Sequence, residues 1–378
     1  MSATNASPGG SSRVSAAAGR DRPIVCFATQ GHGHIEGLRI RQLLEALEPV
    51  DYPFDRARKL RSAIGLLALA ARRRPSLMVM EGTGTAGGVP LMLIDAFLGI
   101  PYLVSAGDAV GPYLRLRSPL AGFVGGLYER LLFRRCAGSI GWTPYLVGRA
   151  LTYGAPRGIT VAGWTRSGPS PGARARVRSR LGISEDTLVV GFTGSIHYAK
   201  QRDYVYGSEL VSAVRRVQRR DVAVCMLGEG SGLALLRDAA GEDLGKRILL
   251  PGRVPPEEVP DYLAAFDLAS LSQSVDRVGS FRYTTKLPEY LSAGLPVITG
   301  QTPLSYDLDE GYFWRLPGSA PWSQRYFDAL VALLEGLTHE EVQARREALE
   351  RRAADPFDKS AQQRRACAFV RDLLAERT

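Results

Sequence analysis

The stretch Ser280-Phe-Arg-Tyr-Thr-Thr-Lys-Leu-Pro-Glu-Tyr-Leu-Ser-Ala-Gly-Leu-Pro-Val-Ile-Thr-Gly300 decides the fold, because it combines a loop, a short helix and a buried strand. Thr284 and Thr285 are good candidates for capping the amino end of the helix, and Gly294 ends it. The apolar run at 295–299 then predicts a strand. A helix beginning after a loop points its free N–H groups and its positive dipole end outward, so we expect an anion such as a diphosphate there.

Glu289 lies about one turn further along the same helix. A carboxylate at this place can accept two hydrogen bonds from the vicinal hydroxyl groups of a ribose. Together with the anion site, it predicts that the segment binds a nucleotide. The alternative is that Glu289 merely decorates an exposed helix, but the glycine and proline residues around it make the pattern specific.

This segment resembles the donor-binding motif of GT-B glycosyltransferases, and most closely that of the retaining enzymes of glycosyltransferase family 4. In that motif a Lys-Leu-x-Glu-Tyr-Leu-x-x-Gly-x-Pro-Val block holds the nucleotide of an activated sugar. The matching residues here are Lys286, Leu287, Glu289, Tyr290, Leu291, Gly294, Pro296 and Val297. One position departs from the family: many members carry a second glutamate eight residues before the ribose-binding one, and this chain has Phe281 there.

Short apolar runs alternate with helical patterns along most of the chain. Strands are predicted at 24–28, 77–80, 102–104, 139–140, 158–162, 187–193, 222–227, 247–250 and 268–271, with helices near 34–47, 57–74, 88–98, 203–218, 231–240 and 256–265. This βαβ rhythm predicts an α/β fold of two Rossmann-like, doubly wound parallel-sheet domains that face each other across a cleft. The resemblance implies the same GT-B architecture.

The domain limits follow from changes in composition. Residues 1–22 are rich in Ser, Ala and Gly without an apolar core, which predicts a disordered leader and not a signal peptide. An acceptor domain is expected at 23–162, a linker rich in glycine, proline and serine at 163–178, and a donor domain at 179–355. The resemblance implies that a last helix, within 356–378, crosses back onto the first domain.

The loop from Gly194 to Lys200 follows a predicted strand in the donor half. The resemblance implies that this loop contacts the donor diphosphate, with Lys200 as the matching lysine and Ser195 where an arginine is usual. Arg202 is close enough in sequence to compensate. The alternative is that both cations open a solvated helix.

A second donor loop, Pro251-Gly-Arg-Val-Pro255, follows the strand predicted at 247–250. In the resembled fold the backbone of this loop contacts the nucleobase, which implies donor contacts for Arg253 and Val254.

The loop Gln30-Gly-His-Gly-His-Ile-Glu-Gly37 joins the first predicted strand to a helix, so its amides can meet an anion or a substrate. It resembles the Gly-His loop of GT-B acceptor domains, which implies acceptor-side roles for Gly31, Gly33 and His34 and makes His34 the candidate base of an inverting enzyme. It also looks like a loose dinucleotide fingerprint, with Asp51 near the spacing of the ribose acid. An NAD-dependent oxidoreductase therefore stays open as an alternative.

A second glycine-rich turn, Glu81-Gly-Thr-Gly-Thr-Ala-Gly-Gly88, adds Gly84 and Gly87 to the acceptor-side candidates. Family 4 enzymes often have a His-Asp pair after the next strand, and the histidine contacts the donor sugar. This chain has Gly107-Asp108 instead. Asp108 is thus a candidate catalytic residue, with the capping of a helix as its alternative role.

No metal or other cofactor is expected beyond the nucleoside diphosphate sugar as co-substrate. Asp307-Leu-Asp309 has the Asp-x-Asp pattern that chelates manganese in another glycosyltransferase fold, but it falls where GT-B enzymes have no metal site. His32, His34 and Glu36 are three potential ligands within five loop residues, which rarely converge on one ion.

The net charge of +10 is concentrated in the first half, because residues 1–160 carry 19 Lys and Arg against 10 Asp and Glu. Basic residues flank apolar ones at 56–61, 72–74, 113–117 and 128–135, a pattern typical of surfaces that face anionic membranes and also of solvated helices. No nucleic-acid recognition pattern accompanies the charge. Four widely spaced cysteines and no membrane-spanning run favour a cytoplasmic protein, with peripheral contact at the inner membrane face left open.

The sequence therefore predicts a metal-independent, retaining hexosyltransferase whose catalytic candidates are His34, Asp108 and Lys200. The acceptor, lipid-linked or otherwise anionic, is expected on the basic first domain. Because Phe281, Ser195 and Gly107 replace expected groups, a catalytically idle relative that binds a nucleotide or a partner is the main alternative. The sugar, the nucleotide, the acceptor and the oligomeric state do not follow from these residues.

Overall fold

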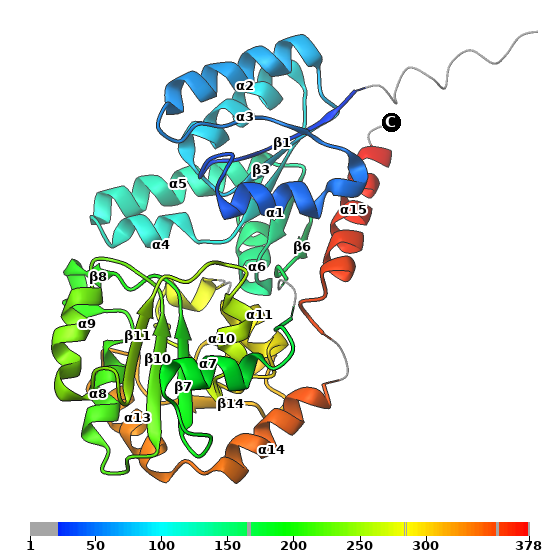
Figure 1. Ribbon diagram of the computed structural model, residues 1–378. Coiled ribbons are helices and arrows are strands. Elements are labelled where there is room, and N and C mark those ends of the chain that lie inside the picture. Colours follow the sequence, from blue (N-terminus) through cyan, green and yellow to red (C-terminus); the bar gives the residue numbers. More distant parts are fainter. Residues whose placement is uncertain (1–21, 165–167, 283, 285, 353–354, 377–378) are drawn as a thin grey trace, which may run out of the picture.

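The computed structural model describes residues 22–164, 168–282, 284, 286–352 and 355–376, which form two α/β domains (Figure 1). Each domain contains a parallel sheet of six strands with an apolar cluster on either face. Parallel strands need covered faces because their βαβ crossovers place helices on both sides. The predicted fold class is confirmed.

The sheet of the first domain has the strand order β2-β1-β3-β4-β5-β6. Its strands are β1 (Ile24–Ala28), β2 (Val50–Asp51), β3 (Leu77–Glu81), β4 (Tyr102–Ala106), β5 (Gly138–Gly141) and β6 (Gly158–Thr160). Its helices are α1 (Ile35–Leu43), α2 (Lys59–Arg73), α3 (Thr85–Leu98), α4 (Val110–Arg115), α5 (Pro119–Arg135) and α6 (Pro144–Thr152), with a 3-10 turn η1 (Glu45–Leu47). The strands at the centre of the sheet are buried along their whole length and mostly apolar, as a sheet buried on both faces requires.

The sheet of the second domain has the order β11-β10-β7-β12-β13-β14. Its strands are β7 (Leu188–Thr193), β10 (Val222–Leu227), β11 (Ile248–Gly252), β12 (Leu268–Leu271), β13 (Val297–Gly300) and β14 (Phe313–Leu316). Its helices are α7 (Ala173–Leu181), α8 (Ser208–Arg216), α9 (Leu233–Ala240), α10 (Val259–Ala264), α11 (Lys286–Ser292), α12 (Pro303–Asp307), α13 (Gln324–Gly336) and α14 (His339–Glu350). Short 3-10 turns are η2 (Lys200–Arg202), η3 (Gly241–Asp243) and η4 (Gly279–Phe281).

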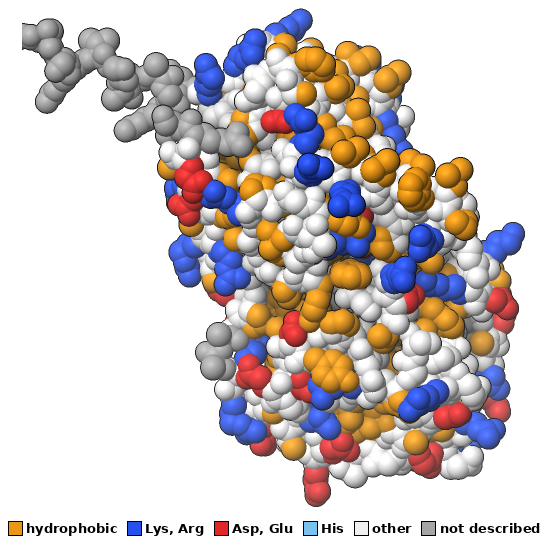
Figure 2. All heavy atoms as spheres, turned by 180° about the vertical axis from the view of Figure 1, so that it is seen from behind, with side chains coloured by type: hydrophobic (Ala, Val, Ile, Leu, Met, Phe, Trp, Pro, Cys, Tyr) orange, Lys and Arg blue, Asp and Glu red, His pale blue; other side chains and the backbone are white. Residues whose placement is uncertain are grey.

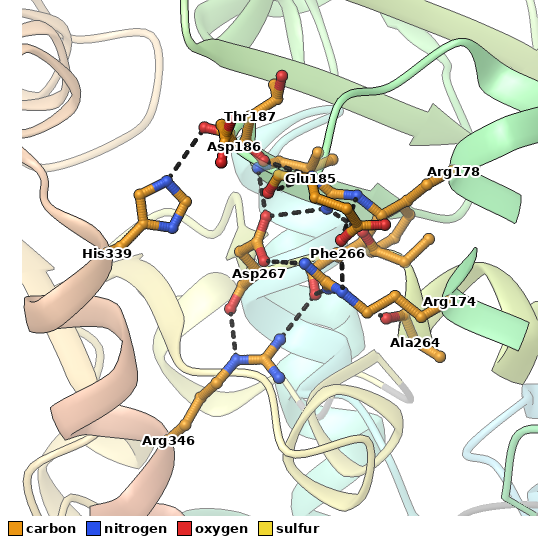
Figure 3. A network of polar contacts seen from close by, with 12 residues as sticks. Arg174, Arg178, Glu185, Asp186, Thr187, Ala264, Phe266, Asp267, His339 and Arg346 are labelled. Carbon is orange, nitrogen blue, oxygen red and sulfur yellow. Dashed lines mark hydrogen bonds and ion pairs between the residues drawn. The ribbon is translucent and has the colours of Figure 1, made fainter. Parts of the chain in front are cut away.

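Helix α7 begins inside the predicted linker and packs on the second domain. Asp267 anchors it by accepting hydrogen bonds from Arg174 at 2.8 Å and Arg178 at 3.2 Å (Figure 3). The Asp267 oxygen that accepts from Arg178 also accepts from the Val189 amide. Arg346 of α14 reaches the same corner by donating to the Phe266 and Asp267 carbonyls (Figure 3). The fully buried Arg178 thus has a carboxylate partner, which offsets the cost of removing its charge from water. Residues 173–178 therefore belong to the second domain.

Helix α15 (Lys359–Ala375) crosses back from the second domain to the first (Figure 1). Phe369, Val370 and Leu373 pack into the apolar cluster under β1 and α1. Gln363 donates to the Gln42 carbonyl at 2.7 Å, which ties the helix to the end of α1. Helix α15 therefore connects the second domain to the first.

Candidate functional site

A cavity of about 600 Å³ opens at the carboxyl ends of the strands in the second domain. Thr193 and Leu227 are the last residues of β7 and β10, and both line it. In open α/β sheets this edge is where ligands bind. The sequence-predicted residues that it brings together are Gly194, Ser195, Arg253, Val254, Lys286 and Glu289.

Lys286 places its ammonium group against the glycine loop after β7. Its Nζ lies 4.2 Å from the centroid of the Phe192 ring, and its Cε lies beside Gly194. Burial, and then the nearby Arg282 charge, lower the pKa of Lys286 to about 8, although Glu209 and Glu289 oppose this. A cation held in a poorly solvated pocket destabilises the folded protein while the pocket is empty, and it attracts an anion strongly.

The helix that carries Lys286 also carries Glu289 to the same cavity. Thr284 accepts a hydrogen bond from the Lys286 amide at 3.3 Å, which agrees with a capping role. The other proposed cap, Thr285, lies outside the described residues. Leu287 matches the family motif for a structural reason, because its side chain is buried in the core cluster below the helix.

The loop after β11 also lines the cavity, through Arg253 and Val254. Arg253 forms an ion pair with Glu229 at 2.9 Å, and both side chains are largely exposed. An exposed pair of this kind contributes little to stability, so the Arg253 side chain can change partner at small cost.

Lys200 and Arg202 do not line the cavity. They form η2, between the short strands β8 (Tyr198–Ala199) and β9 (Tyr204–Val205), and α8 begins only at Ser208. Arg202 pairs with Asp276 at 3.4 Å and lies over the Trp322 ring, while Lys200 is exposed. The predicted helix near 203–218 therefore starts later than expected, because a small hairpin occupies its first residues. Lys286 is the cation that lies beside Gly194 in the loop after β7.

In the first domain the loop at 30–37 leads from β1 into α1. Gly31 has a φ of 116°, which favours glycine, whereas a side chain at Gly33 would meet nothing within 4 Å. His34 is the N-cap of α1 and accepts from the Glu36 amide at 3.4 Å. Burial and the Arg56 charge lower its pKa, so the neutral imidazole that a general base requires is favoured.

Glu36 and Glu81 are carboxyl groups at this edge that sequence reasoning did not single out as catalytic. Glu36 Oε2 is buried without a hydrogen-bond partner in the described part of the chain, and burial together with Glu81 and Asp108 raises the pKa of Glu36 to about 7. Glu81 is fully buried and accepts from Arg39 at 2.6 Å and from the Trp142 indole at 2.9 Å. This edge of the first sheet is therefore rich in buried acid groups.

Asp108 reaches across the cleft and forms an ion pair with Arg282 of the second domain at 3.4 Å. Burial raises the pKa of Asp108, and Arg282 opposes the shift. The preceding Gly107 packs against Trp142, because a Cβ there would lie 3.0 Å from the indole ring. The indole occupies the space that a larger side chain at position 107 would need.

The glycines of the second loop are explained by packing. A Cβ on Gly84 would lie 2.9 Å from Thr29 Cβ, and one on Gly87 would lie 2.7 Å from Thr29 and 2.9 Å from Met80 and Phe27. Only glycine allows α3 to approach the sheet this closely.

Several residues that the sequence offered as metal ligands or as a ribose acid are engaged with other groups. Asp307 accepts from the Tyr145 hydroxyl, and Asp309 caps the next turn and pairs with Arg315. His32 pairs with Asp51 at 2.7 Å, and Arg41 also binds that carboxylate. Asp51, the residue at the spacing of a ribose acid, is thus occupied by two basic side chains.

Comparison with known proteins places this geometry in a class. Residues 187–334, which contain the cavity's strands and α11, match the family model described as glycosyl transferases group 1. No curated protein matches the chain. The matching domain and the two-domain fold together define a GT-B glycosyltransferase.

Solved structures extend the likeness to nearly the whole chain. Sucrose-phosphate synthase from Thermosynechococcus elongatus is 14% identical with a TM-score of 0.67, over 94% of this chain and 100% of that one. WaaG, a glycosyltransferase involved in lipopolysaccharide biosynthesis, is 13% identical with a TM-score of 0.62, over 89% and 98%. S. aureus MnaA in a co-structure with UDP is 13% identical with a TM-score of 0.60, over 94% and 97%. At these identities the likeness establishes the fold.

Proposed function

We propose that this protein moves a sugar from a nucleoside diphosphate sugar to a hydroxyl group of an acceptor held by the basic first domain, without a metal ion and with retention of configuration. The observation that carries the proposal is the donor pocket, in which Lys286 and Glu289 from one short helix meet the glycine loop at Gly194. Lys286 supplies a cation for the diphosphate, and Glu289 supplies a carboxylate for the ribose.

The transfer requires charge stabilisation more than it requires an added base. The acceptor oxygen bonds to the anomeric carbon, the bond from that carbon to the diphosphate breaks, and the diphosphate leaves with the electron pair. Negative charge grows on the leaving oxygen, where the poorly solvated ammonium group of Lys286 interacts strongly with it. The released diphosphate takes the acceptor proton, as the family resemblance implies for retaining enzymes. In an inverting reaction, His34 would be the candidate base.

The test of donor binding is a thermal-shift screen of the full chain with UDP-, GDP- and dTDP-sugars. The structurally similar MnaA was solved together with UDP, which makes uridine nucleotides the first choice. A ligand that binds only the folded state raises the melting temperature, so one of these donors should do so. Glu289→Ala should abolish the shift, while Glu340→Ala, on the exposed first turn of α14, should keep it.

Donor turnover separates the enzyme from an idle relative. Release of nucleoside diphosphate by the wild type, lost in Glu289→Ala, supports the transferase. Tight donor binding without turnover or hydrolysis under any acceptor would instead support a nucleotide-binding protein. A fluorescence titration with NADH addresses the oxidoreductase alternative, and saturable NADH binding without any response to sugar nucleotides would overturn the proposal.

A further inference from the structure

A second cavity, of about 560 Å³, lies between the domains on the side of α4 and α5. Residues of α4, α5 and α6 form its walls, and Arg277 and Phe281 of the second domain close it. Four arginines face it: Arg115, Arg130, Arg149 and Arg277. We call it the arginine pocket.

The positive charge of the arginine pocket is largely uncompensated. Arg149 is neutralised by Glu129, which accepts from it at 2.9 and 2.7 Å. Within the described residues, Arg115, Arg130 and Arg277 have neither an ion pair nor a hydrogen bond from their side chains.

The nearby acids do not change this balance. The three carboxylates in residues 82–135 are each paired with an arginine: Asp95 with Arg135, Asp108 with Arg282, and Glu129 with Arg149. Three unpaired guanidinium groups around one cavity favour a ligand with several negative charges, and a phosphate or diphosphate accepts their forked donors best.

The same cavity continues into an exposed apolar surface. Its lining residues Phe123 and Leu127 belong to a stripe of α5 that also contains Leu120, Val124 and Leu131. These positions recur at the three- and four-residue spacing of one helix face, and Leu120 and Phe123 are 71% and 68% exposed.

This stripe is a second apolar face on one helix. The opposite face of α5, with Leu132 and Phe133, is already buried in the core. Figure 2 shows hydrophobic side chains gathered on the first domain with basic ones among and beside them. Apolar surface of this extent beside arginines suits an amphiphile with an anionic head.

The arginine pocket also lies close to the donor pocket along the chain. Phe281 lines the first and Lys286 lines the second, and these two residues are five positions apart in the sequence. Five residues span at most about 18 Å. One extended acceptor can therefore reach from the arginines toward the donor pocket.

We propose that the arginine pocket binds the phosphate or diphosphate of a lipid-linked acceptor, whose apolar chain lies along the exposed stripe of α5. The inference rests on the proposed function, since it assigns the acceptor class of the same transfer. It identifies the acceptor as a sugar linked through a phosphate or diphosphate to a prenyl or related lipid, with a hydroxyl group of that sugar as the accepting group. The charge and the apolar stripe are both needed, because either alone would suit many ligands.

The test is calorimetric titration of the full chain with farnesyl diphosphate, a soluble lipid diphosphate, in the presence of UDP to fill the donor pocket. Inorganic pyrophosphate tests the head group alone, and farnesol tests the chain alone. We expect farnesyl diphosphate to bind at least tenfold more tightly than either. Arg130→Gln should weaken its binding by about tenfold, as the loss of one charge-assisted hydrogen bond predicts.

Arg134→Gln is the matched control. It lies one turn further along α5, is exposed like Arg130, and does not line the pocket. Binding unchanged by Arg134→Gln supports the inference. Equal loss in Arg130→Gln and Arg134→Gln, or binding of pyrophosphate or farnesol as tight as that of farnesyl diphosphate, would overturn it. A donor-induced thermal shift without any farnesyl diphosphate binding would overturn the inference alone, and absence of both would overturn the proposed function as well.

Discussion

Gly194 and Lys286 lie so close together that any side chain at position 194 would meet the lysine. A Cβ built on Gly194 would lie 2.4 Å from Lys286 Cε and 2.9 Å from its Nζ. Gly194 also has a φ of 122°, which side chains rarely adopt. The loop after β7 therefore uses glycine both for its backbone conformation and to admit the cation.

Gly194→Ala should reduce stability and displace the ammonium group. Backbone strain of this kind costs about 1–3 kcal/mol, and we expect the thermal shift caused by the donor to disappear. Gly182→Ala is the control, since Gly182 also has a positive φ of 68° but a Cβ there meets nothing within 4 Å. Chemical denaturation and donor titration measure both effects. An intact donor response in Gly194→Ala would show that the position of Lys286 does not matter for binding.

Lys286→Met should stabilise the protein while it weakens donor binding. The folded-state pKa of about 8 lies below the ordinary value of 10.5. Below pH 8 the lysine is charged in both states, and its charge destabilises the folded state. At pH 7 we expect a gain on the order of 2 kcal/mol in the free energy of unfolding, which shrinks as the pH rises from 8 toward 10.5.

The same variant should bind the donor more weakly although it is more stable. Donor affinity should fall at least tenfold in Lys286→Met, because an apolar chain replaces the ammonium group. Lys246→Met changes an exposed lysine of the same domain and serves as the control. A variant that is both less stable and equally able to bind donor would contradict this account of Lys286.

The buried pair Arg39–Glu81 should be costly to break from one side. Arg39 also donates to the Val161 carbonyl at 2.7 Å, and its guanidinium lies 4.5 Å from the centroid of the Trp142 ring. Arg39→Met leaves a buried carboxylate without its main partner, which typically costs about 3–5 kcal/mol. Adding Glu81→Gln should recover part of the loss. Urea denaturation of the two single variants and the double variant measures the coupling, and strictly additive losses would argue against it.

The strands and the helix that carries Lys286 and Glu289 could be predicted because both are local in the sequence. β10 and β12 have the bounds that the sequence predicts, since each is a short, fully buried and mostly apolar run. The block that carries Lys286 and Glu289 lies on one helix, so its spacing alone brings the two groups together.

The features that the sequence did not predict depend on tertiary contacts, which hydrophobic periodicity does not reveal. Helix α5 is apolar on two faces and shows no clean helical pattern, and the hairpin that displaces Lys200 consists of two-residue strands. The Arg39–Glu81 pair joins residues 42 positions apart. The environment of Glu36 depends on burial among groups from three segments, which only the folded chain assembles.

Glu36 should make stability depend on pH in a direction opposite to that of most carboxylates. Its folded-state pKa of about 7 exceeds the ordinary value of 4.5, so the folded state prefers the protonated acid. The stability associated with the neutral form is complete below about pH 4.5 and is lost as the pH rises through 7.

The variant Glu36→Gln has an uncharged side chain of the same shape at every pH. Its free energy of unfolding, relative to that of the wild type, should therefore rise by about 2 kcal/mol between pH 4.5 and pH 8. Urea denaturation at a series of pH values measures this difference, with the exposed Glu45→Gln as the matched exchange. If this difference stays constant over the pH range, Glu36 has its ordinary pKa in the folded protein. Its unpartnered oxygen is then solvated.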